Sequence, residues 1–214
     1  MLLENGIWIS KQNPSKTAHG AALFLDRDGV VIKEVHYISR AEDVVLETGA
    51  VELLTWARDR GLGIVVVTNQ SGIARKLFGW AEFEAVEAEI ARQLAAHGVS
   101  IDLTIACSFH KDYTPDFGPA QERWRKPGPA MLELGAAMIQ AELATSWMVG
   151  DRTSDIGAAA NAGLAGAIHV QTGHGASAGD AAVALAGKDF SVSSVADPAA
   201  ALQLLHDVFA KDSS

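Results

Sequence analysis

The sequence predicts an α/β fold, a Rossmann-like three-layer sandwich in which helices cover both faces of a mostly parallel sheet. Short apolar runs alternate along the chain with amphipathic segments, which is the pattern of repeated strand–helix units. The apolar runs carry hydrophobic residues at consecutive positions, as strands buried on both faces do. A length of 214 residues allows one such domain with a substantial core. We therefore expect right-handed crossovers, with ligands bound at the carboxyl ends of the strands.

Six segments are predicted to be strands. The first, AALFL at residues 21–25, is apolar throughout and ends abruptly in charged residues. The second, GIVVV at residues 63–67, is rich in β-branched side chains. The other strands are expected at residues 101–106, 147–149, 167–170 and 190–195.

The predicted helices lie between and after these strands. Residues 50–59 and 80–97 carry apolar side chains at helical spacing, and Gly61 and Gly98 follow them as helix ends. Further helices are expected at residues 130–143, 158–162 and 198–210. Residues 11–20 are polar and contain Pro14, so we expect a leader that crosses the surface, within an N-terminal extension of residues 1–20.

The bulk composition limits the partners and the compartment. The formal net charge is −9, so we expect neither nucleic acid nor an anionic membrane surface as a partner. Cys107 is the single cysteine, which excludes an internal disulfide and indicates a reducing compartment. No apolar run approaches the roughly 18 residues that span a bilayer, and Glu4 argues against a signal peptide. We expect a cytoplasmic monomer.

Two carboxylates follow the first predicted strand. Asp26 and Asp28 are separated by one residue, so they can face the same pocket. Two carboxylates at so short a distance repel each other unless a cation such as Mg²⁺ lies between them or one of them takes up a proton. One of them can attack phosphorus while the other protonates the leaving oxygen. The alternative is a simple turn with an internal ion pair.

Polar residues also follow the second predicted strand. Thr68, Asn69, Gln70 and Ser71 offer a hydroxyl and main-chain amides that can cradle a phosphate, although the same residues suit a helix N-cap. Later in the chain, Lys126 can offset the charge of a phosphate, although Lys-Pro is also typical of a solvated turn before a helix.

A third acidic segment follows the fourth predicted strand. Asp151 can complete a metal site begun by Asp26, and Asp155 can orient Lys126 or a metal-bound water from outside the ligand set. An N-cap for the following alanine-rich helix is the alternative for this acidic pair.

The order of these motifs resembles that of the haloacid dehalogenase superfamily of phosphohydrolases. The segments FLDRDGVV, VVVTNQSGIAR, RKPGPAML and MVGDRTSDIGAAANAG are similar to those of the heptose bisphosphate phosphatases and the related histidinol-phosphate phosphatases. The resemblance covers residues 21–214, which it identifies as a phosphatase domain. It implies an Mg²⁺-dependent phosphomonoester hydrolase that works through an aspartyl-phosphate.

The resemblance also implies roles for individual residues. It makes Asp26 the nucleophile and Asp28 the general acid and base, with Mg²⁺ held by Asp26, the Asp28 carbonyl and Asp151. Thr68 and the Asn69 amide grip the transferred phosphoryl group.

Beyond these residues, the resemblance implies that Lys126 neutralises the charge of the phosphoryl group. It also implies that Arg125 reaches the substrate, for example at a second phosphate. His36 and Tyr37 fall where the heptose enzymes have a substrate-contacting loop. The motif spacing leaves no room for a large cap domain after the first strand, so the site is open or covered only by the loop of residues 109–124.

The sequence departs from its relatives in that loop. The heptose phosphatases carry a structural zinc there, and Cys107 and His110 cannot supply its four ligands, while Glu122 and Trp124 replace the later cysteine pair. We expect no structural zinc and interpret Cys107 as a buried small hydrophobe that ends the third strand.

Several functions remain open at this stage. The substrate is expected to be a small phosphorylated metabolite, either a sugar (heptose) bisphosphate or histidinol phosphate or another small metabolite. A receiver-like signalling domain has similar residues, but its phosphate-accepting carboxylate follows a later strand. A non-catalytic phosphate-binding protein has commonly lost a carboxylate, whereas Asp26, Asp28, Lys126 and Asp151 are all present.

Overall fold

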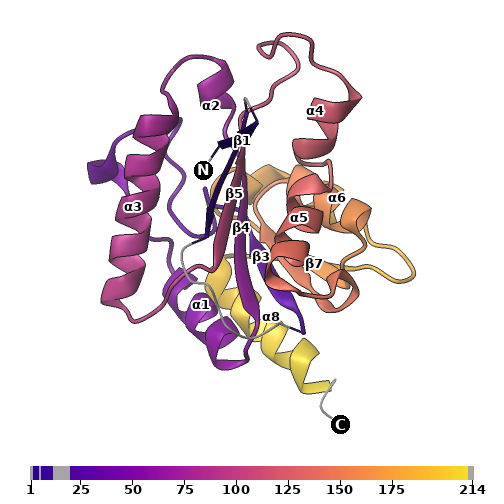
Figure 1. Ribbon diagram of the computed structural model, residues 1–214. Helices are drawn as coiled ribbons and strands as arrows, with labels where there is room; N and C mark the ends of the chain where they lie inside the picture. Colours follow the sequence, from indigo (N-terminus) through magenta and orange to yellow (C-terminus); the bar gives the residue numbers. More distant parts are fainter. Residues whose placement is uncertain (1, 5, 12–19, 212–214) are drawn as a thin grey trace.

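The centre of the molecule is one sheet, seen in the computed structural model, which describes residues 2–4, 6–11 and 20–211 (Figure 1). Its strands are β1 (Leu2–Glu4), β2 (Ile7–Lys11), β3 (Ala22–Leu25), β4 (Gly63–Asn69), β5 (Leu103–Cys107), β6 (Trp147–Gly150), β7 (Gly166–Val170) and β8 (Ser191–Val195). Across the sheet they lie in the order β1–β2–β5–β4–β3–β6–β7–β8. The strands from β5 to β8 in this order pair in parallel, whereas β1 and β2 are antiparallel at one edge. The predicted mostly parallel sheet is confirmed.

Helices cover both faces of this sheet. They are α1 (Ala50–Asp59), α2 (Ser71–Ala74), α3 (Trp80–Ala96), α4 (Pro119–Trp124), α5 (Ala130–Ile139), α6 (Thr153–Ala162), α7 (Gly179–Val183) and α8 (Pro198–Lys211). Three single 3₁₀ turns are η1 (Ala41–Asp43), η2 (Leu143–Thr145) and η3 (Gly175–Ser177). None of the helices in the described ranges has both the length and the apolar character needed to cross a bilayer.

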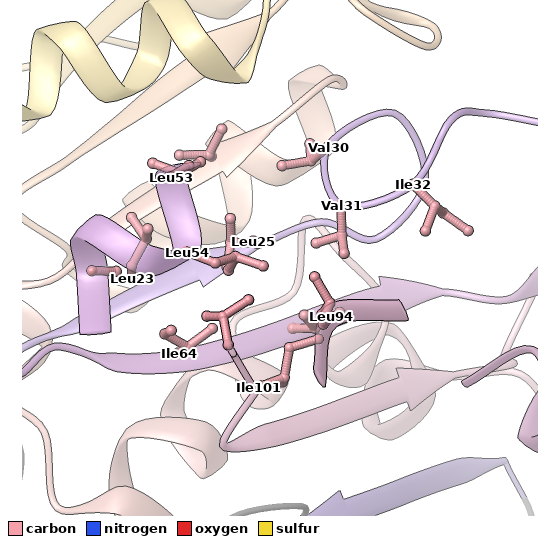
Figure 2. Packing of buried hydrophobic residues seen from close by; sticks show 14 of the residues in the cluster. Leu23, Leu25, Val30, Val31, Ile32, Leu53, Leu54, Ile64, Leu94 and Ile101 are labelled. Atoms are coloured by element: carbon pink, nitrogen blue, oxygen red, sulfur yellow. The ribbon is translucent and has the colours of Figure 1, made fainter. Parts of the chain in front are cut away.

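The core is divided by the sheet into two apolar layers, because successive side chains of a strand point to opposite faces. In β3, Leu23 and Leu25 pack with α1, α3 and α8, while Ala22 and Phe24 pack with α5, α6 and α7. Figure 2 shows part of the first layer, in which Leu23 and Leu25 of β3 and Leu53 and Leu54 of α1 belong to one packed cluster. The three-layer sandwich predicted from the sequence is therefore the observed architecture.

Some predicted boundaries of helices and strands were wrong, and the local backbone explains the two helical ones. The helix predicted at residues 130–143 ends at Ile139, because Gln140 takes a left-handed conformation with φ of 56°. The helix predicted at residues 158–162 already begins at Thr153, since the Asp155 carboxylate accepts the Arg152 N–H at 2.9 Å and caps the first turn. The strand predicted at residues 101–106 starts only at Leu103.

The edge strand β2 was not predicted, because residues 1–20 were interpreted as an extension. It pairs with β5 from Ile7 opposite Cys107 to Lys11 opposite Leu103. The predicted surface leader lies mostly at residues 12–19, outside the described residues, and the division into an extension and a domain stays a prediction.

Candidate active site

A cleft of about 360 Å³ opens beyond the carboxyl ends of the parallel strands. It is lined by nearly all of the residues that the sequence singled out: Asp26, Asp28, His36, Tyr37, Thr68, Asn69, Gln70, Ser71, Arg125, Lys126 and Asp155. Asp151 does not line the cleft itself but has a carboxylate oxygen within 4.8 Å of those of Asp26 and Asp155. Because the carboxyl ends of parallel strands meet at one edge of the sheet, residues that are more than 100 positions apart in the sequence lie close together here.

Asp26 lies at the floor of the cleft, directly after β3. Its main-chain N–H donates to the Val149 carbonyl of β6 at 2.9 Å, so the strand pairing continues through this residue. Its Oδ1 accepts the Arg27 N–H at 2.7 Å and lies 2.9 Å from Lys126 Nζ. Only 6% of the residue is exposed, and it borders the cleft.

Lys126 is held from its main chain to its ammonium group. The Asn69 side chain accepts the Lys126 N–H and donates to the Lys126 carbonyl, both at 3.1 Å. The ammonium group donates to the Val67 carbonyl at 2.7 Å and lies 2.6 Å from Asp155 Oδ1. Burial lowers the pKa of Lys126, but Asp155 and Asp26 outweigh this and raise it above its ordinary value. The ammonium group therefore stays charged beside Asp26.

A second set of contacts joins the first two motifs. Gln70 Nε2 donates to Thr68 Oγ1 at 2.8 Å and to Asp28 Oδ2 at 3.0 Å. Asp28 also pairs with Arg27, with Nη2 3.0 Å from Oδ1, so the internal ion pair considered for this turn is present. It coexists with the placement of both carboxylates at the cleft, and the two interpretations are compatible.

The carboxylates outnumber the cations at the floor of the cleft. Oxygens of Asp26, Asp151 and Asp155 lie within 4.8 Å of one another, with Lys126 as the cation among them. Burial raises the pKa of Asp26 well above its usual range against the opposing effect of Lys126, and burial together with Asp155 raises the pKa of Asp151 to about 6. Such a cluster favours either protons or a cation.

The residues fit a divalent metal. Asp151 is 1% exposed; its Oδ2 accepts the His174 N–H at 2.7 Å, and its Oδ1 has no hydrogen-bond partner among the described residues. A buried carboxylate oxygen without a donor is a suitable ligand for Mg²⁺, which prefers hard oxygen atoms. The carboxylates that approach each other are those of Asp26, Asp151 and Asp155, whereas the carboxylate of Asp28 is held by Arg27 and Gln70. The Asp28 carbonyl as a ligand stays a prediction.

The loop after β7 also borders the site, and none of its residues was among the predicted site residues. The loop supplies the His174 N–H that Asp151 accepts. It also brings Gly173 so close to Asp151 that a Cβ on Gly173 would lie 2.3 Å from Asp151 Oδ2. Thr172 Oγ1 donates to the Gly29 carbonyl and ties the loop to the turn that follows Asp28. The signal available in the sequence was the same as for the other motifs, namely polar residues at the end of a parallel strand.

Three arginines lie around the rim of the cleft: Arg75, Arg125 and Arg152. None of them forms an ion pair within the described part of the chain, although the protein as a whole is acidic. Arg125 Nη1 donates to the Phe109 carbonyl at 3.0 Å, and Arg75 lies 4.5 Å from the centre of the Tyr113 ring and 5.9 Å from that of Tyr37. The rim therefore carries unneutralised positive charge.

This charge also acts on His110 at the rim. Burial, Arg125 and Arg75 lower the pKa of His110. The two residues of the predicted substrate-contacting loop lie together, with the ring of His36 4.4 Å from that of Tyr37.

Cys107 ends β5 and is completely buried, which confirms its interpretation as a small hydrophobe. Burial raises the pKa of its thiol to about 12. His110 lies at the cleft, and its Nδ1 accepts the Asp112 N–H at 3.2 Å.

Comparison with known proteins identifies relatives of the chain. Residues 123–198 match the model of the HAD-hydrolase-like family. The chain is 37% identical to a D-glycero-beta-D-manno-heptose-1,7-bisphosphate 7-phosphatase from Mesorhizobium japonicum, over 77% of this chain and 76% of the relative. It is 33% identical to the enzyme of the same name from Yersinia pestis, over 82% of this chain and 92% of the relative.

Solved structures agree with these relatives. A protein from Mesorhizobium loti described as a HAD-like phosphatase superposes with a TM-score of 0.80 at 32% identity, covering 95% of this chain and 96% of the other. The D,D-heptose 1,7-bisphosphate phosphatase from B. bronchiseptica, in complex with magnesium and phosphate, gives a TM-score of 0.71 at 32% identity and covers 87% of this chain and 98% of the other.

Proposed function

Because this chain belongs to the HAD-like phosphatases, we propose that it removes one phosphate from a sugar bisphosphate, with a heptose bisphosphate as the leading candidate. The observation that carries the proposal is the buried pair of Asp26 and Lys126 at the floor of a cleft with a basic rim. Phosphoryl transfer requires mainly positioning and charge stabilisation, and this site supplies both. The relatives support the sugar, since the names of two of them specify a heptose 1,7-bisphosphate.

The first half of the reaction forms a covalent intermediate. A carboxylate oxygen of Asp26 attacks phosphorus, the phosphorus–oxygen ester bond breaks, and the leaving sugar oxygen takes a proton from Asp28. Lys126 and Thr68 both line the cleft, and in this proposal the ammonium group and the hydroxyl stabilise the charge of the phosphoryl oxygens. The product at this point is an aspartyl-phosphate on Asp26.

The second half regenerates the enzyme. Asp28, now ionised, takes a proton from a water molecule that attacks the same phosphorus, and the bond to Asp26 breaks to release inorganic phosphate. Asp26, Asp151 and the Asp28 carbonyl would hold Mg²⁺, which would supply positive charge next to the transferred group. Lys126 offsets the charge that returns to Asp26 through the contact at 2.9 Å.

The basic rim supports a substrate with a second anionic group. Arg75, Arg125 and Arg152 border the cleft without ion pairs in the described residues, so they are available to a distal phosphate. The net charge of −9 and the single cysteine support a cytoplasmic enzyme for small metabolites, and we propose that it acts as a monomer.

The test is a substrate panel measured by phosphate release with and without Mg²⁺. It contains heptose 1,7-bisphosphate, other sugar bisphosphates, sugar monophosphates and histidinol phosphate. We expect Mg²⁺-dependent activity that is highest on a sugar bisphosphate and is lost in Asp26→Asn. Activity that survives in Asp26→Asn would refute the mechanism, and a preference for histidinol phosphate would refute the substrate class.

A further inference from the structure

Arg27 is the largest fully buried side chain of the described residues, and it is one of the residues that line the cleft. It follows Asp26 and is only 1% exposed. A buried guanidinium group needs partners for its donors, because an unpaired charge away from water is strongly unfavourable. The role of the Arg27 side chain can therefore be argued from the partners of its guanidinium group.

One side of the guanidinium group forms a fork with Asp28. Arg27 Nη2 lies 3.0 Å from both carboxylate oxygens of Asp28, and Nε lies 3.2 Å and 3.3 Å from them. A planar fork that contacts both oxygens fixes the plane of the carboxylate as well as its position. With Gln70 on Oδ2, the Asp28 side chain is held from two directions.

The other side of the guanidinium group is bound by Glu87, which reaches in from α3. Glu87 is 4% exposed, and its Oε1 lies 3.2 Å from Arg27 Nη1. Phe83 precedes Glu87 by one helical turn, and the centre of its ring lies 5.1 Å from Arg27 Cζ. Helix α3 thus presents both a carboxylate and an aromatic ring to the same guanidinium group.

From this chain of contacts we propose that Glu87 is a positioning residue for proton transfer: it orients Arg27, and Arg27 orients the Asp28 carboxylate toward the leaving oxygen. The inference rests on the proposed role of Asp28 as general acid and deepens it. Glu87 itself does not line the cleft, so it touches neither the substrate nor the reacting atoms. Its carboxylate gives Arg27 a partner that takes no part in the reaction.

Glu87 has a physical effect that packing alone does not explain. Burial raises the pKa of Glu87, which shows that the helix carries this carboxylate at a cost, while Arg27 opposes the rise. An apolar residue would fill the same space without that cost. Without Glu87, Nη1 has lost its anionic partner and the fork is free to rotate about the remaining contacts.

The test compares two leaving groups. A sugar alkoxide needs a proton as it leaves, whereas p-nitrophenolate leaves without one, so a misplaced general acid slows formation of the aspartyl-phosphate only from the sugar ester. Hydrolysis of the aspartyl-phosphate, in which Asp28 acts as the base, is common to both substrates. The two reactions are therefore compared in a single-turnover experiment that follows release of the leaving group. We expect Glu87→Gln to lower the single-turnover rate of leaving-group release from heptose 1,7-bisphosphate by about tenfold and from p-nitrophenyl phosphate by less than about twofold. Arg27→Lys, which cannot form the fork, is expected to show the same selectivity.

Controls separate this proposal from the proposed function. Glu84→Gln alters the same helix and removes only the negative charge of the acceptor of Trp8 Nε1, so both reactions should be unchanged. Asp28→Asn reports on the general acid itself: if it lacks the leaving-group selectivity, the proposed role of Asp28 is wrong.

Suppose that Asp28→Asn slows the reaction of the sugar ester more than that of p-nitrophenyl phosphate. If Glu87→Gln then slows both reactions equally, or slows neither of them, the positioning role of Glu87 is refuted. Circular dichroism checks that the Glu87 variant folds, and Arg27→Lys decides the matter if it does not.

Discussion

Lys126 and Asp26 form a contact of 2.9 Å between Nζ and Oδ1, at a position where both side chains are almost completely buried. The same ammonium group lies 2.6 Å from Asp155 Oδ1, so one cation bridges the proposed nucleophile and a second buried carboxylate. Asp155 is in turn fixed by the Arg152 N–H at 2.9 Å. This arrangement sets the position of Lys126 before any phosphate arrives.

The first prediction concerns this bridge. Lys126→Met leaves Asp26 and Asp155 buried without their common cation, so the free energy of unfolding should fall by about 3 kcal/mol, the scale for removing one partner of a buried ion pair. Phosphatase activity should fall by at least about a hundredfold, since the charge on the phosphoryl group loses its offset. Urea denaturation and phosphate release measure the two effects. Lys188→Met, at an exposed position, is the control, and equal stability of the two variants would contradict the prediction.

The second prediction concerns Mg²⁺ as a ligand of the folded state. Because Asp151 Oδ1 is buried without a partner in the described residues, Mg²⁺ should bind the native protein and raise its melting temperature in a differential scanning experiment. In Asp151→Asn the increase should be at least halved, while the variant without Mg²⁺ should melt no lower than the wild type, because one buried charge is gone. An undiminished increase in Asp151→Asn would place the metal elsewhere.

The third prediction uses two glycines with positive φ. Gly173 has φ of 54°, and an added Cβ would lie 2.3 Å from Asp151 Oδ2, whereas Gly163 has φ of 75° and open space around that position. Both alanine variants should lose about 1 kcal/mol of stability from the backbone strain, and Gly173→Ala should lose more than Gly163→Ala because its Cβ also clashes with Asp151. Only Gly173→Ala should also weaken Mg²⁺ binding, by at least about tenfold, as measured by isothermal titration calorimetry. Equal Mg²⁺ affinities would show that the loop does not position Asp151.

The fourth prediction concerns pH and Cys107. Its thiol has a pKa of about 12 in the fold because it is buried, against about 8.5 in an unfolded chain. Between these values the unfolded chain has lost the proton that the folded chain keeps, so stability falls as pH rises. The wild type should therefore lose more stability than Cys107→Ala when the pH is raised from 8 to 10, as denaturation curves will show. Parallel slopes for the two proteins would contradict the burial of an ionisable thiol.

The fifth prediction concerns the distal phosphate. Arg125→Ala should raise KM for a sugar bisphosphate by about tenfold, the scale of one charge-assisted contact, with a smaller effect on the corresponding monophosphate. Arg123→Ala is a matched control, because Arg123 is exposed, pairs with Glu133 and does not line the cleft. Initial-rate kinetics on both esters give the comparison. Similar changes of KM for the two esters would remove Arg125 from the recognition of a second phosphate.

The residues at strand ends could be predicted because their positions follow from one rule. Asp26, Thr68 and Asp151 come directly after or at the end of apolar strands, and parallel strands bring those ends to one edge of the sheet. Lys126 lies in a loop, and only the order of motifs in a known superfamily identified it. The two hydrogen bonds between the Asn69 side chain and the main chain of Lys126 depend on side-chain geometry, which a sequence does not contain.

The residues that escaped prediction depend on contacts between distant segments. Glu87 lies in a helix whose apolar spacing was recognised, but a glutamate in such a helix is ordinarily solvated, and its partner Arg27 is 60 positions away. His174 follows β7 as the other motifs follow their strands, but it contributes a main-chain N–H, which has no residue-type signal. Strand β2 was missed because its partner β5 is far along the chain.

The two antiparallel strands at the sheet edge have a consequence for solubility. Strand β5 is buried at every position and would expose a row of free amide and carbonyl groups if β2 did not pair with it. An apolar strand with an open edge is a template for association with another copy. Deletion of residues 1–11 is thus expected to yield a protein that aggregates during expression, even though every residue of the proposed chemistry lies after that segment.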